Sequence, residues 1–332
     1  MTVPDVAFVC CIESGSLEDP TVRMIESLRR FGGAFAHCQI VAVTPRFSFP
    51  LHHTTRTALD RLNVDYLYRP ERNHRYCWFN FLNKPLSLIF AKDIIKCSII
   101  CWIDSDIIVV AEPFKLLLGK DEDIVACPAD IQEMGSKGPG DKFECLWEYI
   151  LEANGLSPDS FPWTKTCYEG VRIRLYWNGG IFAFRATSAF AQQYFDATVR
   201  ALDTRIISAR DDYSLGLNEM SAIGIAAVQL GLRRRELPFT HNYTISPSLK
   251  EWRDDDRLAA ARIVHYHHSM WPDHWLQFLS QMRYAHPEVG KWLSHIGPMR
   301  NPAKPTTRLA NRILKISRNA GESAYRARCR VV

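Results

Sequence analysis

The sequence has 332 residues, 47% apolar and 23% charged, a globular composition that excludes a disordered or low-complexity chain. No apolar run reaches the ~18 residues that a membrane-spanning helix needs, and the apolar stretch 6–12 lacks the basic lead of a secretory signal. Residues 301–332 carry eight Lys or Arg against one acid, a net charge of +7. Since the whole chain has a net charge of +5, residues 1–300 have a net charge of −2. That balance excludes a basic nucleic-acid-binding body.

Segments with the apolar pattern of strands alternate with helical segments along the first 130 residues. We predict buried strands at 6–12, 37–43, 64–68, 98–103 and 123–127, and helices at 18–31 and 83–95. Beyond a Gly-rich loop at 135–141, we predict helices at 145–154, 188–202, 212–230 and 274–286, and strands at 175–185 and 263–267. This alternation indicates an α/β fold with a mainly parallel central sheet flanked by helices. Residues 1–300 are predicted to form a single domain.

The basic segment 301–332 has two interpretations. It is either a disordered tail or an amphipathic helix at 308–318, on which Leu309, Ile313 and Ile316 share one face. Such a helix would attach peripherally to an anionic membrane.

Six of the ten cysteines lie in or beside strand-like runs and no C-x-x-C occurs. We therefore expect a cytoplasmic protein, on the inner face of a membrane if the tail binds lipid.

Asp104-Ser105-Asp106 is the sharpest chemical feature, because it interrupts the most apolar run of the chain. The acids sit at the carboxyl end of a predicted strand, the edge where open α/β sheets bind ligands. Residues i and i+2 of a strand share a face, so the two carboxylates converge and need a cation between them. Carboxylate oxygens suit Mn²⁺ or Mg²⁺. Two further Asp-x-Asp triplets, at 121–123 and 254–256, lie in charged, loop-like context.

Histidines form the second feature, in the predicted strand 263–267. His265 and His267 would share one face of this strand. Neutral imidazole binds Mn²⁺ or Zn²⁺ well, although a single His is more often a structural hydrogen-bonding group. With an acid pair elsewhere in need of ligands, His265 is our candidate metal ligand, and His267 is a weaker one.

Three further motifs have both functional and ordinary interpretations. Asn178-Gly179-Gly180 either lets a ligand approach the backbone or marks a β-bulge. Asp211 would point into a pocket, whereas Asp212 would equally serve as a helix N-cap. Lys84 opens a predicted helix and would reach a diphosphate, or else lie on the surface.

In this order the motifs resemble a GT-A glycosyltransferase, most closely glycosyltransferase family eight, the group of glycogenin and the bacterial lipopolysaccharide galactosyltransferases. The resemblance spans residues 6–271 and is divergent. The matching segments are Ala7-Phe8-Val9, Glu26-Ser27-Leu28, Lys84, the run Ile103 to Val109, Asn178 to Phe182, Asp211-Asp212, Leu237-Pro238 with Asn242-Tyr243, and Val264-His265-Tyr266.

The resemblance implies a Rossmann-like GT-A fold with a nucleotide-binding half at 1–130 and an acceptor half at 131–300. Asp104, Asp106 and His265 would hold Mn²⁺ (or Mg²⁺) against a nucleotide diphosphate. Contacts to the donor would come from Lys84, Cys11, Glu13, Ser105 and Gly179. Asp211, Asp212 and Asn178 would line the sugar as the catalytic set.

The implied activity is transfer of a sugar, with retention, from a nucleotide-sugar donor, usually UDP-linked. The acceptor would be a glycan, a lipid-linked molecule or a small molecule. Two departures stand out: the family has Asp-Gln where this chain has Asp211-Asp212, and a Lys-Pro-Trp where it has Met270-Trp271-Pro272. The missing lysine contact would pass to Arg253, Arg257 or Arg262.

Two alternatives remain at this point. A sugar-nucleotidyltransferase also uses acids on an α/β sheet, but needs a basic glycine-rich phosphate loop near the N-terminus, where this chain has Gly15 followed by Glu18 and Asp19. A non-catalytic glycan-binding protein on the same fold is the other. The aromatic residues Trp163, Tyr168, Tyr176, Trp177 and Trp271 are candidates for stacking on a sugar in either case.

Overall fold

A computed structural model describes residues 2–71, 74–246 and 255–332, with the backbone alone at 255. Its main sheet has seven strands in the order β11-β6-β9-β4-β1-β2-β3. The strands are β1 (Val6–Cys11), β2 (Gln39–Thr44), β3 (Asp65–Tyr68), β4 (Ile99–Ile103), β6 (Ile124–Pro128), β9 (Trp177–Arg185) and β11 (Arg234–Glu236). All pairings are parallel except those of β9, which is antiparallel to β4 and β6. The predicted, mainly parallel α/β sheet is thus confirmed.

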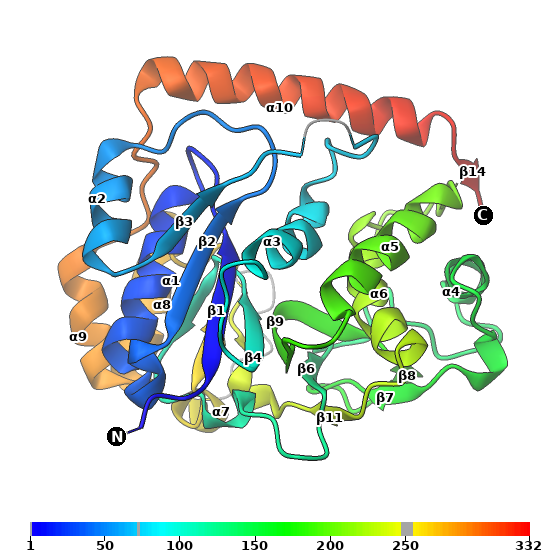
Figure 1. The fold of residues 1–332 in the computed structure, drawn as a ribbon, viewed down its shortest axis with the longest axis horizontal. Coiled ribbons are helices and arrows are strands. Elements are labelled where there is room, and N and C mark those ends of the chain that lie inside the picture. Colours follow the sequence, from blue (N-terminus) through cyan, green and yellow to red (C-terminus); the bar gives the residue numbers. More distant parts are fainter. Residues whose placement is uncertain (1, 72–73, 247–254) are drawn as a thin grey trace.

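Helices cover both faces of this sheet (Figure 1). One face carries α1 (Glu18–Phe31) and α2 (His53–Arg61), and the other carries α3 (Asn83–Ala91), α5 (Phe190–Asp203) and α6 (Gly216–Gln229). Successive β1 residues point to opposite faces: Phe8 packs in the core on the α1 side, and Val9 packs in the core on the α3 side. Burial on both faces explains why these strands are continuous apolar runs in the sequence.

The apolar run at 97–110 contains β4, which ends at Ile103 as the strand predicted at 98–103 does. It breaks at Asp104-Ser105-Asp106, and β5 (Ile107–Val109) leaves the main sheet for a three-stranded one. There β5 pairs with β13 (Ile263–His265), which pairs with β12 (Tyr243–Thr244). The acid pair therefore lies in the turn between two sheets.

Several other boundaries differ from those predicted. The strand at 263–267 ends at His265, because His267 has a positive φ of 48° that a strand does not allow. Helix α6 begins at Gly216 and not at residue 212, so Asp212 is no N-cap. Helices α4 (Glu144–Ala153) and α8 (Trp275–Ala285) lie where expected, whereas α2 and α9 (Pro287–Ile296) were not predicted. The short elements β7 (Trp163–Lys165), β8 (Arg172–Arg174) and α7 (Asp255–Ala259) complete the outer layers.

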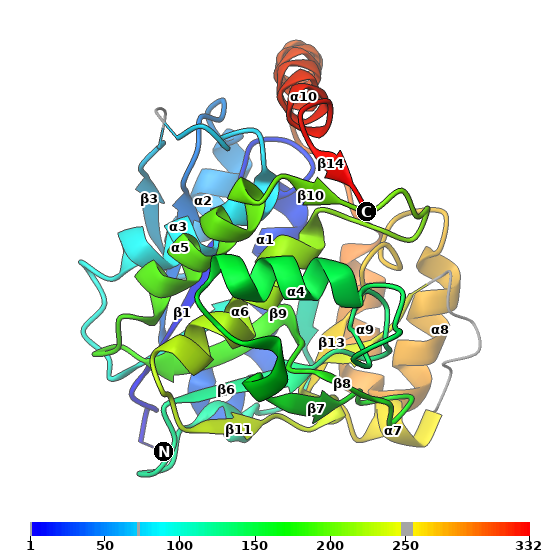
Figure 2. The same ribbon diagram turned by 90° about the vertical axis from the view of Figure 1, so that its right-hand side faces the viewer.

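The basic C-terminal segment is ordered, so the expectation of a disordered tail is wrong. Helix α10 (Pro305–Arg326) lies along one edge of the molecule, and β14 (Arg330–Val331) then pairs in parallel with β10 (Ile206–Ile207) (Figures 1 and 2). No described helix is both long enough and apolar enough to span a bilayer. The division into halves at residue 130 stays a prediction, and the sheet crosses it, since β6 pairs with β9.

Candidate active site

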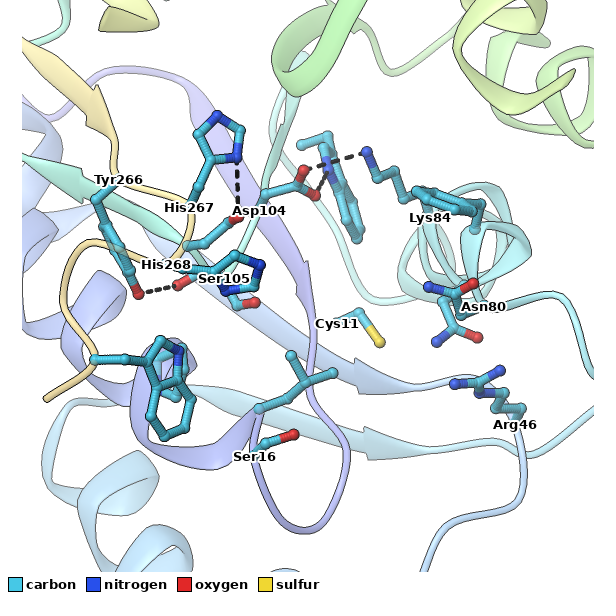
Figure 3. Close-up of a pocket in the computed structure, with 17 residues that line it drawn as sticks. Cys11, Ser16, Arg46, Asn80, Lys84, Asp104, Ser105, Tyr266, His267 and His268 are labelled. Carbon is cyan, nitrogen blue, oxygen red and sulfur yellow. Dashed lines mark hydrogen bonds and ion pairs between the residues drawn. The ribbon is translucent and has the colours of Figure 1, made fainter. Parts of the chain in front are cut away.

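A cavity of about 360 Å³ opens where β1 and β4 end, at the sheet edge predicted to bind a ligand (Figure 3). Its walls come from the segment after β1, the start of α3, the turn between β4 and β5, and the loop after β13. The lining residues are Cys11, Ser16, Leu17, Pro20, Arg46, Asn80, Phe81, Asn83, Lys84, Trp102, Asp104, Ser105, Asp106, Tyr266, His267, His268 and Trp271. Besides Asp104 and Asp106, four residues predicted to bind the donor or the metal line the cavity: Cys11, Lys84, Ser105 and His267.

On one side of the cavity, Asp104 is paired with Lys84. Lys84 Nζ lies 3.2 Å from Asp104 Oδ2, and Trp102 Nε1 donates to Asp104 Oδ1 over 2.8 Å. The same ammonium lies 3.6 Å from Glu219 Oε1 and donates to the carbonyl of Gly179 over 3.0 Å. Lys84 is therefore held by two acids and a backbone oxygen.

The charges of this group do not balance, because one ammonium faces two carboxylates, the partly buried Asp104 and the fully buried Glu219. Burial raises the pKa of Asp104 in spite of Lys84, and it also raises the pKa of Glu219, whose side chain is fully buried. Burial would lower the pKa of Lys84, but Asp104 and Glu219 outweigh it and raise that pKa. Lys84 stays charged, and one further proton or cation can be held among the acids.

On the other side, Asp106 lies beside two imidazoles. His265 Nε2 is 3.2 Å from Asp106 Oδ1, and His267 Nδ1 is 3.9 Å from Asp106 Oδ2. The two rings stack with their centroids 4.2 Å apart. The β5–β13 pairing produces this arrangement, because it sets His265 opposite Ile107, the neighbour of Asp106. The positive φ of His267 then turns its ring back over His265.

One donor atom from each of Asp106, His265 and His267 lies within 4.8 Å of the others, so the three can hold a metal ion together. Nε2 is the ring nitrogen of His265 that faces Asp106, whereas its Nδ1 is buried on the Gly180 side without a hydrogen-bond partner. Burial, together with His265, lowers the pKa of His267 to about 3, so its imidazole is neutral and able to donate a lone pair. Two imidazoles and a carboxylate suit a divalent transition metal such as Mn²⁺.

The predicted metal set was Asp104, Asp106 and His265. The structure brings Asp106 and His265 together but adds His267, the weaker candidate, while Asp104 turns to Lys84. A role for Asp104 as a ligand stays a prediction. Asp106 has its pKa lowered, since the imidazoles outweigh burial, whereas burial would lower the pKa of His265 and Asp106 raises it.

Two adjacent glycines make room for both groups. A Cβ atom on Gly179 would lie 2.7 Å from Lys84 Nζ, and one on Gly180 would lie 2.8 Å from the ring of His265. Asn178 Oδ1 accepts a hydrogen bond of 2.8 Å from the Gly180 amide, which fixes the turn of the strand there. The register of β9 against β6 also shifts between Asn178 and Phe182, so the structure agrees with the β-bulge interpretation of this motif, and approach of a ligand there stays a prediction.

Asp211 and Asp212 are exposed in the loop before α6 and are not among the residues that line the cavity. Asp212 forms ion pairs with Lys142 and Arg210 at the surface. Of the aromatics proposed for stacking, Trp271 lines the cavity, whereas Tyr176 and Trp177 are fully buried in the core.

Arg46, Glu219 and Asn83 are site residues that the sequence interpretation missed. Arg46 is the arginine that lines the cavity, whereas Arg262 donates to the carbonyl of Glu112 and packs on Phe114. Arg257 packs near Tyr168, and Arg253 lies outside the described residues. A signal for Glu219 exists, because it is the one acid in the otherwise apolar or small run at 215–228.

One comparison with known proteins identifies a family. A family model described as the Rhodobacterales glycosyltransferase domain matches residues 8–213. A search of curated proteins finds no match.

Three solved structures share a similar arrangement of elements. They are the apo bifunctional glycosyltransferase WbbM (14% identity, TM-score 0.48, 85% of this chain and 49% of that one), the galactosyltransferase LgtC with donor and acceptor sugar analogues (10%, 0.49, 86% and 95%), and the glycosyltransferase GlyE of Streptococcus pneumoniae TIGR4 (12%, 0.49, 92% and 66%). The chain spans about half of WbbM. We draw no conclusion from these three likenesses, because their TM-scores lie below 0.5.

Proposed function

Because the chain belongs to the Rhodobacterales glycosyltransferase domain family and is thus a glycosyltransferase, we propose that its cavity binds a nucleotide-diphosphate sugar, with UDP as the nucleotide. The sugar would pass to a hydroxyl group of a glycan, a lipid-linked molecule or a small molecule. One observation carries the proposal: Asp106, His265 and His267 form a potential metal site at the same sheet edge as Lys84 and Arg46.

Asp106, His265 and His267 are the residues that would hold Mn²⁺ or Mg²⁺, with Asp104 as the further predicted ligand. When bound, a divalent ion neutralises the charge that develops on the departing diphosphate, which is worth several kcal/mol. The chain's own contribution is to place the donor. Arg46 and Lys84 offer positive charge from the wall opposite the histidines (Figure 3).

Retention is the stereochemistry that we propose, following the resemblance to glycosyltransferase family eight. Among the described residues, the carboxylates that line the cavity are Asp104 and Asp106. Each already lies in an ion pair, with Lys84 or His265. This arrangement supports attack by the acceptor hydroxyl on the face that the diphosphate leaves, and it gives less support to a covalent intermediate on Asp211 or Asp212.

A nucleotide-sugar screen tests the proposal. The protein is incubated with UDP-, GDP-, dTDP- and CMP-linked sugars with Mn²⁺ or with a chelator, and released nucleotide is measured without any acceptor. We expect Mn²⁺-dependent hydrolysis of a UDP-sugar and a larger rise in melting temperature with UDP plus Mn²⁺ than with UDP plus chelator. Equal rates and equal melting shifts in both conditions would count against a metal-dependent donor site.

We also propose that the outer face of α10 lies on an anionic membrane from the cytoplasmic side. Leu309, Ile313 and Ile316 are 60%, 61% and 63% exposed on one face of this helix. Exposed Arg312 and Lys315 flank them, and each basic residue near an anionic surface is worth ~1 kcal/mol. Ten free cysteines support the reducing cytoplasm.

Liposome co-sedimentation of the full chain tests this surface. Binding should be stronger to vesicles with anionic lipid than to neutral ones, and an Ile313→Ser/Ile316→Ser variant should bind less to both. A Leu276→Ser variant is the matched control, since this leucine is also exposed but lies on α8. If the Ile313→Ser/Ile316→Ser variant binds anionic vesicles as strongly as the Leu276→Ser control does, the proposed membrane surface is wrong.

A further inference from the structure

Helix α10 contacts segments that lie far apart in the sequence. Near its start, Asn311 Nδ2 donates to the carbonyl of Ser14 over 3.0 Å. Near its end, Tyr325 OH donates to the carbonyl of Leu202 at the end of α5 over 2.7 Å. In Figure 1 the helix passes from the side of α2 to the side of α5. The helix therefore joins the segment after β1, which lines the cavity, to the end of α5, which does not.

The middle of α10 reaches a buried carboxylate behind the cavity wall. Arg318 NH1 donates to Glu13 Oε2 over 3.1 Å, and Arg318 NH2 donates to the carbonyl of Phe47 over 2.7 Å. Glu13 is 7% exposed, and it also accepts from Asn83 Nδ2 over 2.7 Å and from both Nε and NH2 of Arg46. We call Glu13, Arg46, Asn83 and Arg318 the Glu13 cluster.

Two members of the Glu13 cluster line the cavity. Arg46 and Asn83 are lining residues, while Glu13 and Arg318 stand behind them. Burial would raise the pKa of Glu13, but Arg46 and Arg318 outweigh it and lower that pKa, so this carboxylate is ionised. Two guanidinium groups then share one carboxylate, and the cluster keeps one positive charge in excess at the cavity wall. Such a charge complements an anionic diphosphate.

We infer that α10 is part of the donor site: Arg318 holds Glu13 in the orientation from which Glu13 positions Arg46 toward the diphosphate of a nucleotide. This inference rests on the proposed function. Arg318 is a positioning residue, because its guanidinium contacts Glu13 and the backbone of Phe47 and does not line the cavity. Arg46 is bound through Nε and NH2 in a two-point geometry, so a displaced Glu13 would carry the guanidinium out of place.

Substitution of Arg318 in the full chain tests the inference, with UDP plus Mn²⁺ as the probe. Arg318→Met removes both contacts, and Arg318→Lys keeps a charge that can reach Glu13 at one point only. Arg326→Met is the matched control, since Arg326 pairs with Glu322 on the same helix, away from the Glu13 cluster. Isothermal titration calorimetry gives the Kd of UDP, and hydrolysis of a UDP-sugar gives KM and kcat separately.

We expect Arg318→Met to raise the Kd of UDP and the KM of the donor by about tenfold, with kcat changed less than about twofold. Arg318→Lys should fall between it and wild type, and Arg326→Met should match wild type. If UDP binds wild type and Arg318→Met equally well, the inference is wrong while the proposed function stands. If wild type binds neither UDP nor GDP in the presence of Mn²⁺, both are wrong.

A second variant separates positioning from simple loss of the helix. Asn311→Ala/Tyr325→Phe loosens both ends of α10 without touching the Glu13 cluster. Limited proteolysis reports whether α10 remains docked in each variant. A rise in Kd as large as that of Arg318→Met would show that docking of the whole helix matters and would overturn the specific role of Arg318.

Discussion

The two aspartates of one short motif lie in opposite surroundings. Asp104 directly follows a strand of the main sheet and is paired with an ammonium, with a fully buried acid, Glu219, sharing that charge. Asp106 directly precedes a strand of the smaller sheet and lies beside two imidazoles. A lysine cannot bind a metal while it is charged, whereas neutral imidazoles can. The same residue type, two positions apart, thus has a structural ion pair on one side and a potential metal site on the other.

Two glycines of β9, the strand that pairs with β4, correspond to these two sides. Gly179 leaves space for the lysine of the Asp104 side, and Gly180 leaves space for His265 of the Asp106 side. Each side therefore has one aspartate, one partner from a distant segment and one glycine. Variants that change one side alone can show whether the two sides act separately.

Asp106→Ala should have the largest effect. Mn²⁺-dependent turnover should fall at least about 100-fold, because the several kcal/mol of charge neutralisation by the metal is lost. The melting temperature of the metal-free protein should change little. Asp121→Ala is the matched control, since Asp121 belongs to another Asp-x-Asp triplet and its side chain is 96% exposed. Normal Mn²⁺-dependent turnover in Asp106→Ala would refute the metal site.

Lys84→Met should instead reduce stability. Removing the ammonium leaves Asp104 and Glu219 buried together, and breaking a buried ion pair typically costs about 3–5 kcal/mol. Urea unfolding measures the loss. Lys84→Met combined with Glu219→Gln should recover part of it, because one of the stranded charges is gone. An unfolding free energy equal to wild type in Lys84→Met would mean that the charges of this side are balanced in another way.

Gly180→Ala should weaken metal binding by about tenfold, as changes that reorient a metal-binding histidine do. The added methyl group would press on the His265 ring, which is buried and cannot withdraw. Gly179→Ala is the paired variant, and there the methyl group meets the flexible end of Lys84. Calorimetric titration with Mn²⁺ should separate them; equal affinities would show that His265 does not bind the ion.

Asp130→Asn should have the smallest effect, and one that depends on pH. Burial raises the pKa of Asp130 from 3.8 to about 7, so the folded protein resists its ionisation. The native aspartate therefore destabilises the fold increasingly as pH rises from about 4 to about 7, and not below that range. Asn, which still accepts from Thr244, should raise the unfolding free energy at pH 8 but hardly at pH 4. Urea unfolding at both pH values measures this; an equal gain at both would contradict it.

The sequence predicted the Asp106 side better than the Asp104 side. An apolar run interrupted by acids and a strand ending in histidine are local patterns, and each pointed to its place at the sheet edge. His267 was underrated because strand alternation gives no hint of its positive φ. Glu219 was missed although a single acid in the run at 215–228 is a local signal, because its partner Lys84 lies on another helix, 135 positions earlier in the chain.

Loops and the C-terminal segment were the harder parts to predict. Asp211 and Asp212 were chosen on a family pattern, and the chain places them at the surface, where Lys142 offers a partner. For 305–326, charge alone favoured a free tail. What orders this helix is a set of single contacts, such as Arg318 with Glu13, 305 positions apart in the chain.

That separation has a consequence for biosynthesis. Glu13 is synthesised some three hundred residues before Arg318. Until then the nascent protein holds a carboxylate with only part of its final set of partners, and long-range contacts of this kind form late in folding. The wall around Arg46 would be finished only after translation of α10, so a growing chain would carry an immature nucleotide cavity.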